Sequence, residues 1–529
     1  MNVLIINLTR FGDLIQTQPV ISGHRALGHR VGLVCLENFA SAASLLDGVD
    51  RIFPLPGAGL LARLDQDWRL AVRDMAAFAA DIPASFPADV VINLTPSVSS
   101  RLLTRALAPA GARVAGFGLD QFGFNADTSS WAAFLQMAGA NRGASPFNIC
   151  DIFRRVAGLR GEGNTLVLAQ PDRAALDRAD ALLAGDYGTG QDAGHGAGDG
   201  GGRGGFLALQ PGASEERRRW PVEHFVALAR QARERHGLVP VLLGSAGEAA
   251  LGQRFRAAYG HGCVDLMGRT SLTGLAGVLS RCHALVTNDT GTMHLAAGIG
   301  VPLVAVFLAT AQPWDTGPYR PGTICLEPDM PCHPCGFGTT CPHDNACRRA
   351  VTPEAMFAAL DRLMTGRDSG FSPGARVWLT RTGDQGFFDL VSLSGHGESD
   401  RALWIALQRA NYLPFLDDGP LPGVTGIGRS LGPGMAAELS KILTSGADLL
   451  FLLSRQGMVL ADNPRPQAKA KFLASWQRLQ SVLAADKYLN ILGLLWMFES
   501  QQCGEDLASL LRLIERYRAL FASLSAEFA

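Results

Sequence analysis

The chain has 529 residues, of which 47% are apolar and 18% are charged, a composition typical of globular proteins with large cores. Its formal net charge of −1 excludes a global electrostatic field that would attract nucleic acid. The most apolar runs, 449–453 and 491–498, are far shorter than the roughly 20 residues that a bilayer-spanning helix needs.

The N-terminal residues 1–184 predict a first α/β domain. Short apolar runs at 3–7, 32–36 and 89–94 alternate with stretches of helical character, which is typical of βα repeats around a parallel sheet. No basic region precedes the first apolar run, and Arg10 and Asp13 follow it at once, unlike the pattern of a signal peptide. We therefore expect a cytoplasmic protein.

A carboxylate follows the first expected strand, in the segment TRFGD at 9–13. Ligands of open α/β sheets bind beyond the carboxyl ends of the strands, so Asp13 is a candidate functional residue. Gly12 would let the chain turn tightly and let a ligand approach the backbone. The alternative is that Asp13 only N-caps the helix that begins here. The turn does not have a GxGxxG pattern, which argues against an ordinary dinucleotide dehydrogenase.

A glycine-rich stretch at 185–205 separates two α/β halves. It cannot bury enough apolar surface to offset the entropy of ordering, so we predict a flexible loop or linker. The alternation then resumes over residues 206–368, with strands expected at 206–210, 239–245, 283–288 and 301–307. Two successive halves of this kind predict two facing doubly wound domains with a cleft between them.

Two polar turns in the second half have the chemistry of a phosphate site. In QPGASEERRRWP (210–221) Ser214 and three consecutive arginines follow a strand end, a combination that suits a phosphate. A solvated charge run balanced by two glutamates is the alternative. In NDTGTMH (288–294) the N–H groups of a helix N-terminus and the Thr hydroxyls would hold a diphosphate, and Asp289 could accept a hydrogen bond from a sugar hydroxyl. His294 alone would more often be a core residue.

A cysteine cluster occupies residues 332–347, CHPCGFGTTCPHDNAC. Four thiols within 16 residues predict a structural Zn or Fe site if the compartment is reducing. Its ligands would be Cys332, Cys335, Cys341 and Cys347. Only the first pair has CxxC spacing, so free buried or redox-active thiols are the alternative.

Residues 369–529 have a different character and carry no chemical motif. We predict an accessory domain that begins with a hairpin at 378–395, around residues 384–386. Helices should follow, because the Leu- and Ala-rich stretch 468–498 has helical spacing of its apolar residues.

Taken together, the motifs resemble glycosyltransferase family 9, the ADP-heptose:lipopolysaccharide heptosyltransferases. The segments that carry the resemblance are LTRFGDLIQTQP (8–19), QPGASEERRRWP (210–221), NDTGTMHLAA (288–297), FLATAQPWDTGPYRPG (307–322) and the Cys-rich stretch leading into TPE (352–354). The C-terminal extension lies outside it. The resemblance implies a GT-B fold, made of two facing Rossmann-like domains, with the acceptor on the first domain and the nucleotide sugar on the second. It also implies an inverting transfer without a catalytic metal.

The resemblance further implies roles for individual residues. Asp13 would be the general base, and Arg218 would bind the diphosphate and stabilise the leaving ADP. The other expected donor-binding residues are Ser214, Glu248, Thr270, Asp289, Thr290, Gly291, Thr292 and His294. Acceptor contacts are expected from Arg10, Arg101 and Arg105, with ordinary helix surface as the alternative for the last two.

The implied function is transfer of heptose from ADP-heptose to a lipopolysaccharide-core or related cell-surface glycan. The partners would then be the nucleotide sugar and a lipid-linked glycan, with peripheral contact at the inner face of the inner membrane and no nucleic acid. One alternative is a protein O-heptosyltransferase of the autotransporter type, whose C-terminal helices would dock a polypeptide. The other is a non-catalytic nucleotide-sugar-binding assembly protein.

Overall fold

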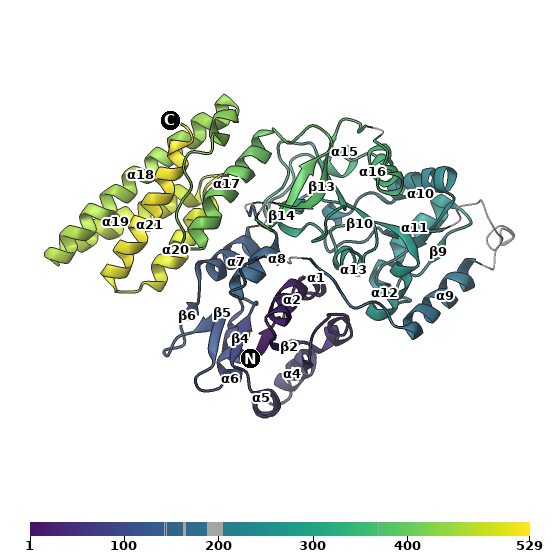
Figure 1. Cartoon of the computed structure of the whole chain (residues 1–529), viewed down its shortest axis with the longest axis horizontal. Coiled ribbons are helices and arrows are strands. Elements are labelled where there is room, and N and C mark those ends of the chain that lie inside the picture. The colour runs from purple at the N-terminus through teal and green to yellow at the C-terminus, as the bar shows by residue number, and fades with distance from the viewer. Residues whose placement is uncertain (142, 144, 162–164, 188–204, 369, 384) are drawn as a thin grey trace. The chain divides into compact units, whose positions relative to one another are not determined.

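The computed structural model describes residues 1–141, 143, 145–161, 165–187, 205–368, 370–383 and 385–529 (Figure 1). By their contacts they divide into a first unit, Met1–Ala115 with Asn148–Ser394, and a second unit, Gly116–Phe147 with Gly395–Ala529. Most of the glycine-rich stretch 185–205 lies outside the described residues. Its first residues end helix α9, and Gly205 begins strand β7. The predicted boundaries at 184, 205 and 368 stay predictions.

Four parallel strands of the first sheet lie within the first unit, in the order β3-β2-β1-β4. They are β1 (Asn2–Ile6), β2 (Arg30–Leu36), β3 (Arg51–Leu55) and β4 (Val90–Asn93). The chain leaves β1 to one side for β2 and later returns to its other side for β4. The turn after β1 is therefore at a topological switch point, where open α/β sheets bind ligands.

Helices connect these strands and lead to the second sheet. They are α1 (Phe11–Ile15), α2 (Gln18–Ala26), η1 (Glu37–Phe39), α3 (Ala40–Ala43), α4 (Gly57–Leu64), α5 (Trp68–Ser85), α6 (Val98–Leu107), α8 (Ile149–Val156) and α9 (Arg173–Tyr187). Leu4, Ile6 and Val34 of the strands pack with Ile82 and Phe86 at the end of α5 in one apolar core.

The second sheet has the order β14-β13-β12-β11-β10-β7-β8-β9, parallel from β12 to β9. Its strands are β7 (Gly205–Gln210), β8 (Leu238–Leu242), β9 (Val264–Asp265), β10 (Cys282–Asn288), β11 (Leu303–Val306), β12 (Ile324–Pro328), β13 (Ala375–Thr382) and β14 (Phe388–Ser392). β7 lies between β8 and β10, so the turns after β7 and β10 flank a second switch point.

The helices of this half are η2 (Glu216–Arg218), α10 (Val222–His236), η3 (Ala246–Glu248), α11 (Ala249–Tyr259), α12 (Leu272–Ser280), α13 (Gly291–Ile299), α14 (Pro313–Thr316), α15 (Cys347–Ala350) and α16 (Pro353–Thr365). α10 and α16 contribute Phe225 and Met356 to a core with the apolar side chains of the sheet. The two parallel sheets confirm the predicted pair of doubly wound domains.

The predicted hairpin at 378–395 forms as β13 and β14, but it extends the second sheet. β13 pairs antiparallel with β12, with Cys325 opposite Trp378, and β14 pairs with β13. Asp151 also ties this hairpin to α8, because its carboxylate accepts hydrogen bonds from the Phe388 N–H and from the Tyr319 hydroxyl. The hairpin thus belongs to the first unit by its contacts. Asp384, in the predicted turn, lies outside the described residues.

The second unit is mainly helical, as predicted for the C-terminal region. Its elements are the end of β5 (Arg113–Leu119), β6 (Asn125–Asp127), α7 (Ser130–Ala140), α17 (Asp400–Leu416), η4 (Ile427–Ser430), α18 (Pro433–Asp462), α19 (Pro466–Ala484), α20 (Asn490–Gln502) and α21 (Leu507–Ala526). The buried carboxylate of Glu499 on α20 accepts hydrogen bonds from Ser130, Arg516 and Tyr517. A segment from the first third of the chain is therefore part of this helical core.

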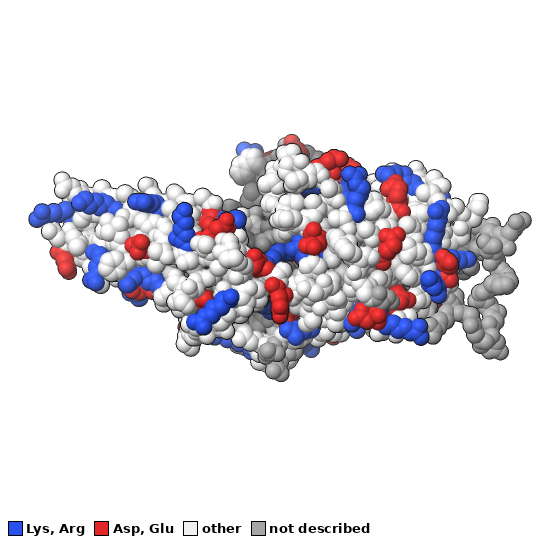
Figure 2. Space-filling view, turned by 90° about the horizontal axis from the view of Figure 1, so that it is seen from above, with Lys and Arg blue, Asp and Glu red and all other residues white. Residues whose placement is uncertain are grey.

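The surface of the molecule carries mixed charge. Figure 2 shows Lys and Arg side chains interspersed with Asp and Glu over the face in view, in keeping with the net charge of −1. No helix among the described residues has both the length and the apolar character that spanning a bilayer requires.

Candidate functional site

The donor half of the candidate site is built on the ends of β7 and β10. β10 reads CHALVTN, and every residue except His283 is buried, so the strand is held firmly in the sheet. The polar residues Asp289 and Thr290 follow at once, and α13 begins at Gly291. Eight of the nine residues of α13 are buried, because the helix packs on the sheet. These elements fix the start of α13 beside the turn that follows β7.

Arg218 and Asp289 form a buried ion pair between the two turns. Both side chains are only 7% exposed, and Arg218 Nη2 donates to Asp289 Oδ2. The other terminal nitrogen of Arg218 lies 3.4 Å from the Ser214 hydroxyl. A guanidinium held in this way presents fixed donors and a full positive charge in surroundings that strengthen electrostatic interactions. Three residues expected at the donor site thus lie together.

The predicted alternative of a solvated charge run is wrong for Arg218, because its side chain is only 7% exposed. The two neighbouring arginines have other contacts. Arg217 pairs with Glu215 at 2.7 Å and donates to the Thr339 carbonyl at 2.9 Å. Arg219 donates to the Ala213 carbonyl, and Arg348 donates to the Arg219 carbonyl. These contacts fasten the turn to itself and to the Cys-rich segment, and they leave Arg218 as the arginine that contacts Asp289.

Asn288 joins the two turns, and sequence reasoning missed it. Its fully buried side chain donates through Nδ2 to the carbonyls of Gln210, Pro211 and Gly212, at 2.9 to 3.3 Å. Its Oδ1 accepts from the Trp220 N–H at 2.9 Å. One amide therefore satisfies backbone groups on both sides of the turn that carries Ser214 and Arg218. An asparagine at a buried strand end directly before a polar turn was the signal that could have identified it.

Glu248 lies against the same turn. A Cβ atom on Gly212 would be 1.8 Å from Glu248 Oε1, so only glycine allows this approach. The carboxylate is oriented by a capping box, in which Oε2 accepts from the Ser245 N–H and hydroxyl, both at 2.9 Å. The structure thus brings Glu248 to the donor turn. Thr270 lies partly buried between β9 and α12, and its place at the donor site stays a prediction.

The first turn of the chain meets the start of α13. A Cβ on Gly12 would lie 3.2 Å from His294 Cδ2 and 3.4 Å from Gly291 Cα, and a Cβ on Gly291 would lie 2.3 Å from the Phe11 ring. Both glycines serve this close approach of α1 to α13. Thr290 and Thr292 stand at the same helix start, with hydroxyls 3.2 Å from the Thr287 hydroxyl and 3.3 Å from Gln210 Oε1 respectively.

Asp13 lies in the first turn of α1, one residue after this contact. The N-cap of α1 is Arg10, whose side chain makes no capping hydrogen bond, so the alternative in which Asp13 is an N-cap is wrong. The buried Asn7 fixes the helix, because its Nδ2 donates to the Asp13 carbonyl at 3.2 Å and to the Thr17 hydroxyl at 2.7 Å. The partly exposed Asp13 side chain is therefore on a short helix that Asn7 ties to the end of β1.

The expected acceptor residues differ in their surroundings. Arg10 and Arg105 are exposed, whereas Arg101 is fully buried within α6. The alternative of ordinary helix surface is therefore wrong for Arg101. α6 follows β4 at the carboxyl edge of the first sheet, the same edge that carries the Asp13 turn.

The predicted metal site at the four clustered cysteines stays a prediction. No group of three or more His, Cys, Asp or Glu side chains in the described part of the chain is arranged to hold a metal ion. Cys332 is exposed and Cys347 is buried, and Cys341 Sγ accepts from the Asn345 N–H at 3.4 Å. Burial raises the pKa of the Cys335 and Cys347 thiols.

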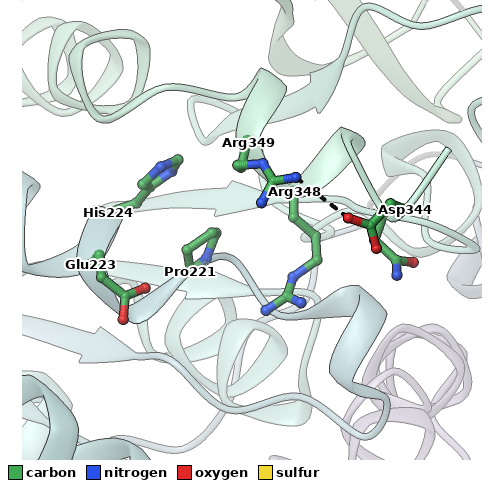
Figure 3. A pocket seen from close by; sticks show the side chains of 7 residues that line it. Pro221, Glu223, His224, Asp344, Arg348 and Arg349 are labelled. Atoms are coloured by element: carbon green, nitrogen blue, oxygen red, sulfur yellow. Dashed lines mark ion pairs between the residues drawn. The ribbon is translucent and has the colours of Figure 1, made fainter.

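A pocket of about 400 Å³ opens beside the Cys-rich segment. Figure 3 shows Glu223 and His224 on one side and Arg348, Arg349 and Asp344 on the other. Arg349 pairs with Asp344 at 3.8 Å and Arg348 with Glu216 at 3.7 Å. The carboxylates around the pocket offset its guanidinium groups, so its charge gives no preference for an anion.

Comparison with known proteins agrees with the geometry. Residues 153–346 match the model of glycosyltransferase family 9 (heptosyltransferase). Lipopolysaccharide heptosyltransferase 1 of Pseudomonas aeruginosa is 27% identical over 348 residues, which cover 63% of this chain and 86% of that protein. Lipooligosaccharide heptosyltransferase 2 of Haemophilus influenzae is 36% identical over 98 residues, 18% of this chain and 28% of that protein.

Among solved structures, the glycosyl transferase family 9 protein from Veillonella parvula matches with a TM-score of 0.54. The match has 19% identity and covers 69% of this chain and 98% of that one, so it shows the shared fold. These findings confirm the expected resemblance to glycosyltransferase family 9 and the GT-B fold, and they identify the chain as a glycosyltransferase. The family match ends at residue 346, and the C-terminal region lies beyond it.

Proposed function

We propose that the chain transfers heptose from ADP-heptose to a lipopolysaccharide-core or related cell-surface glycan, with inversion at the anomeric carbon. The observation that carries the proposal is the convergence of three turns. Asn288 joins the turns after β7 and β10, Arg218 and Asp289 pair between them, and α13 contacts the first turn of the chain at Gly12. Both relatives described above are named heptosyltransferases.

The donor diphosphate is proposed to bind between the turns after β7 and β10. The Ser214 hydroxyl and the adjacent Arg218 nitrogen would donate to phosphate oxygens, and the start of α13 would add backbone N–H groups. Asp289 would keep Arg218 in place while its own remaining acceptor capacity serves a sugar hydroxyl. Glu248, oriented by Ser245, would accept from the ribose hydroxyls.

Asp13 is proposed as the general base. The acceptor hydroxyl would attack the anomeric carbon, its proton would pass to the Asp13 carboxylate, and the bond from that carbon to the ADP oxygen would break. Arg218 would stabilise the negative charge that develops on the leaving diphosphate. The contact of Gly12 with His294 and Gly291 supports this assignment, because it brings the base-bearing helix to the donor side. The reaction would take place where a lipid-linked acceptor is accessible, at the cytoplasmic face of the inner membrane.

Nucleotide-dependent stabilisation and product release test the proposal. We expect ADP to raise the melting temperature of the full chain more than UDP, GDP or CMP at equal concentration, because ligand binding stabilises the folded state. ADP should then be released from ADP-heptose only when lipopolysaccharide core is added. Selective stabilisation by another nucleotide would refute ADP-heptose as the donor. Transfer of labelled heptose to protein would favour the protein O-heptosyltransferase alternative.

The variant Arg218→Gln should abolish the ADP effect. Arg217→Gln is the matched control, because Arg217 belongs to the same run but contacts Glu215 and Thr339. Equal loss of ADP binding in both variants would contradict the assignment of the phosphate contact to Arg218.

A further inference from the structure

The turn that follows β11 is held in a strained backbone conformation. β11 pairs with β10 so that Val306 lies opposite Asn288, and the two strands end together at the carboxyl edge. Ala309, three residues beyond β11, has a φ of 55°, in the left-handed region that residues with a Cβ atom rarely enter. Ala309 is buried, as are Thr310 and Ala311 after it. Such strain persists only where the surroundings fix the backbone.

The Cys-rich segment fixes this turn, which is called the 309–311 turn below. The Cys335 N–H donates to the Ala309 carbonyl at 2.8 Å. The ring nitrogen Nε2 of His333 lies 3.0 Å from the Ala311 carbonyl. Because a carbonyl only accepts, this nitrogen carries a hydrogen and donates it. Two hydrogen bonds from one segment thus hold the turn at both ends.

The same segment also contacts the turn after β7, on the other side of β10. Arg217 donates to the Thr339 carbonyl at 2.9 Å, and Arg348 donates to the Arg219 carbonyl at 2.8 Å. In the sheet β10 lies between β11 and β7, so the segment bridges the turns on either side of the β10 turn. Its contacts with these two turns come from different residues, so each turn can be disturbed without the other.

A buried carboxylate anchors His333. Glu327 on β12 is fully buried, and its Oε2 lies 3.4 Å from His333 Nδ1. Its Oε1 accepts from Trp378 Nε1 at 3.1 Å and lies 3.6 Å from Arg376 Nε. The Arg376 guanidinium offsets the charge of the carboxylate, and it also donates to the Pro328 carbonyl at 2.7 Å. β12 and β13 therefore fix the imidazole ring whose other nitrogen faces the 309–311 turn.

The order of the strands places the 309–311 turn on the sugar side of the proposed donor site. Ser214 and Arg218 follow β7, and Glu248 follows β8, so the diphosphate and the ribose are proposed to lie over β7 and β8. β11 is on the opposite side of β10 from these two strands. A donor that crosses the carboxyl edge with its nucleotide over β7 and β8 therefore has its sugar over β10 and β11.

We propose that His333 is a positioning residue for sugar transfer, acting through the 309–311 turn. Its Nε2–H and the Cys335 N–H keep Ala309 in the left-handed conformation, and this fixes the wall against which the donor sugar lies. The role of the turn in catalysis rests on the proposed function, whereas the hold of His333 on the turn does not. Loss of the ring donor should misplace the sugar and leave the phosphate contacts of Arg218 intact.

Steady-state kinetics and ADP titration of the full chain test the proposal. His333→Phe keeps a ring but cannot donate to the Ala311 carbonyl. Its kcat with ADP-heptose should fall about tenfold or more, because small misplacements of reacting groups have large effects on rate, while its affinity for ADP stays within about twofold. His333→Gln places an amide donor near the position of Nε2 and should retain kcat within about threefold. Equal losses of kcat in both variants, or a matching loss of ADP affinity, would overturn the proposal.

The substitution Ala309→Gly separates the positioning role from general damage to the core. Glycine enters the left-handed region without a steric cost, so His333→Phe with Ala309→Gly should have a kcat about fivefold or more above that of His333→Phe alone. A packing defect around Glu327 would not respond to a change in the turn. Without such recovery, His333 does not act through the backbone of the 309–311 turn, and the proposal fails.

His24→Phe is the matched control. His24 on α2 is also buried, at 3% exposed against 4% for His333, but it belongs to the half that carries the first sheet. This variant should have the kcat of the native chain, and melting temperatures verify that each variant is folded. An equal loss of kcat in the two Phe variants would show that replacement of any buried histidine has this effect, and would overturn the proposal.

Hydrogen exchange of the peptide 307–312 measures the hold of His333 on the turn without any substrate. Exchange should be about tenfold or more faster in His333→Phe than in the native chain, and unchanged in His24→Phe. A native chain that is inactive with ADP-heptose but shows this difference would refute the proposed function and leave His333 as the residue that holds the turn. Unchanged exchange in His333→Phe would refute the positioning role even in an active heptosyltransferase.

Discussion

The turns after β1 and β10 are organised by the same residue type in different ways. A buried asparagine stands at each strand end: Asn7 directly follows β1, and Asn288 is the last residue of β10. Asn7 binds partners that follow it closely, the Asp13 carbonyl and the Thr17 hydroxyl. Asn288 instead binds the backbone of residues that precede it by about 70 to 80 positions, from the Gln210 carbonyl to the Trp220 N–H. The first asparagine shapes its own turn, and the second joins two turns.

This difference separates two tasks in the proposed reaction. The local arrangement around Asn7 positions the short helix that carries Asp13, so it should affect proton transfer. The long-range arrangement around Asn288 positions Ser214 and Arg218, so it should affect donor binding. Four variants test this division between positioning of the base and positioning of the donor site, and they follow from the largest expected effect to the smallest.

The largest effect is expected for Asp13→Asn. The amide cannot accept the proton of the acceptor hydroxyl, so kcat should fall about 10²- to 10⁴-fold, the usual contribution of a positioned general base. The affinity for ADP should change little, because Asp13 belongs to the half that is proposed to bind the acceptor. Initial rates of ADP release and calorimetric ADP titration measure the two quantities. Asp65→Asn, an exposed position on the same half, is the control, and normal turnover by Asp13→Asn would exclude its role as base.

Arg218→Ala should destabilise the protein and abolish ADP binding. Its removal leaves the Asp289 carboxylate buried without its counter-charge, which typically costs about 3–5 kcal/mol of unfolding free energy. Urea unfolding measures the loss. Arg217→Ala removes a more exposed pair with Glu215, for which about 1 kcal/mol or less is expected. Equal losses from the two variants would show that the Arg218–Asp289 pair has no special energetic role.

Asn288→Ala should raise the donor KM more than it lowers kcat. The change leaves the Trp220 N–H and three carbonyls without their buried partner, with a loss of about 3 kcal/mol, since each unsatisfied group costs about 1–3 kcal/mol and water replaces some of the bonds. Asn411→Ala is a matched control in the second unit, because Asn411 is equally buried and donates to the Leu407 carbonyl. A KM and ADP affinity as in the native chain would contradict the positioning role of Asn288.

The sequence predicted those parts of the fold that depend on local pattern. Buried strands and polar turns are continuous in sequence, so both sheets and the turns at Asp13, Ser214 and Asp289 could be expected. Arg218 could be chosen among three arginines only through the family resemblance. Its partner Asp289 lies 71 residues away, and no local pattern indicates that pairing.

The other differences also involve long-range contacts. Residues 116–147 join the C-terminal helices because Ser130 and Trp131 bind Glu499 and Asp417, and sequence order gives no sign of this. The sequence pattern predicted the hairpin β13–β14 as the start of the accessory domain, but β13 pairs with the edge strand of the parallel sheet, β12. The cysteine spacing predicted a metal site, which stays a prediction; Cys341 Sγ accepts from the Asn345 N–H, and Cys335 Sγ lies 3.7 Å from the Cys332 carbonyl.

The smallest effect is expected for Asn7→Ala, and it tests the division most directly. The variant loses the bonds from Nδ2 to the Asp13 carbonyl and the Thr17 hydroxyl and from the Thr9 N–H to Oδ1, but its partners are close to solvent or can bond to each other. Thr17 already donates to the Asp13 carbonyl at 3.1 Å, so about 1–2 kcal/mol of stability should be lost. If Asn7 serves only the Asp13 helix, kcat should fall several-fold while the donor KM and ADP affinity stay unchanged, the opposite of the pattern expected for Asn288→Ala. A donor KM that rises in both variants would mean that the contact of Gly12 with α13 couples the two halves, and that the division into a base side and a donor side is wrong.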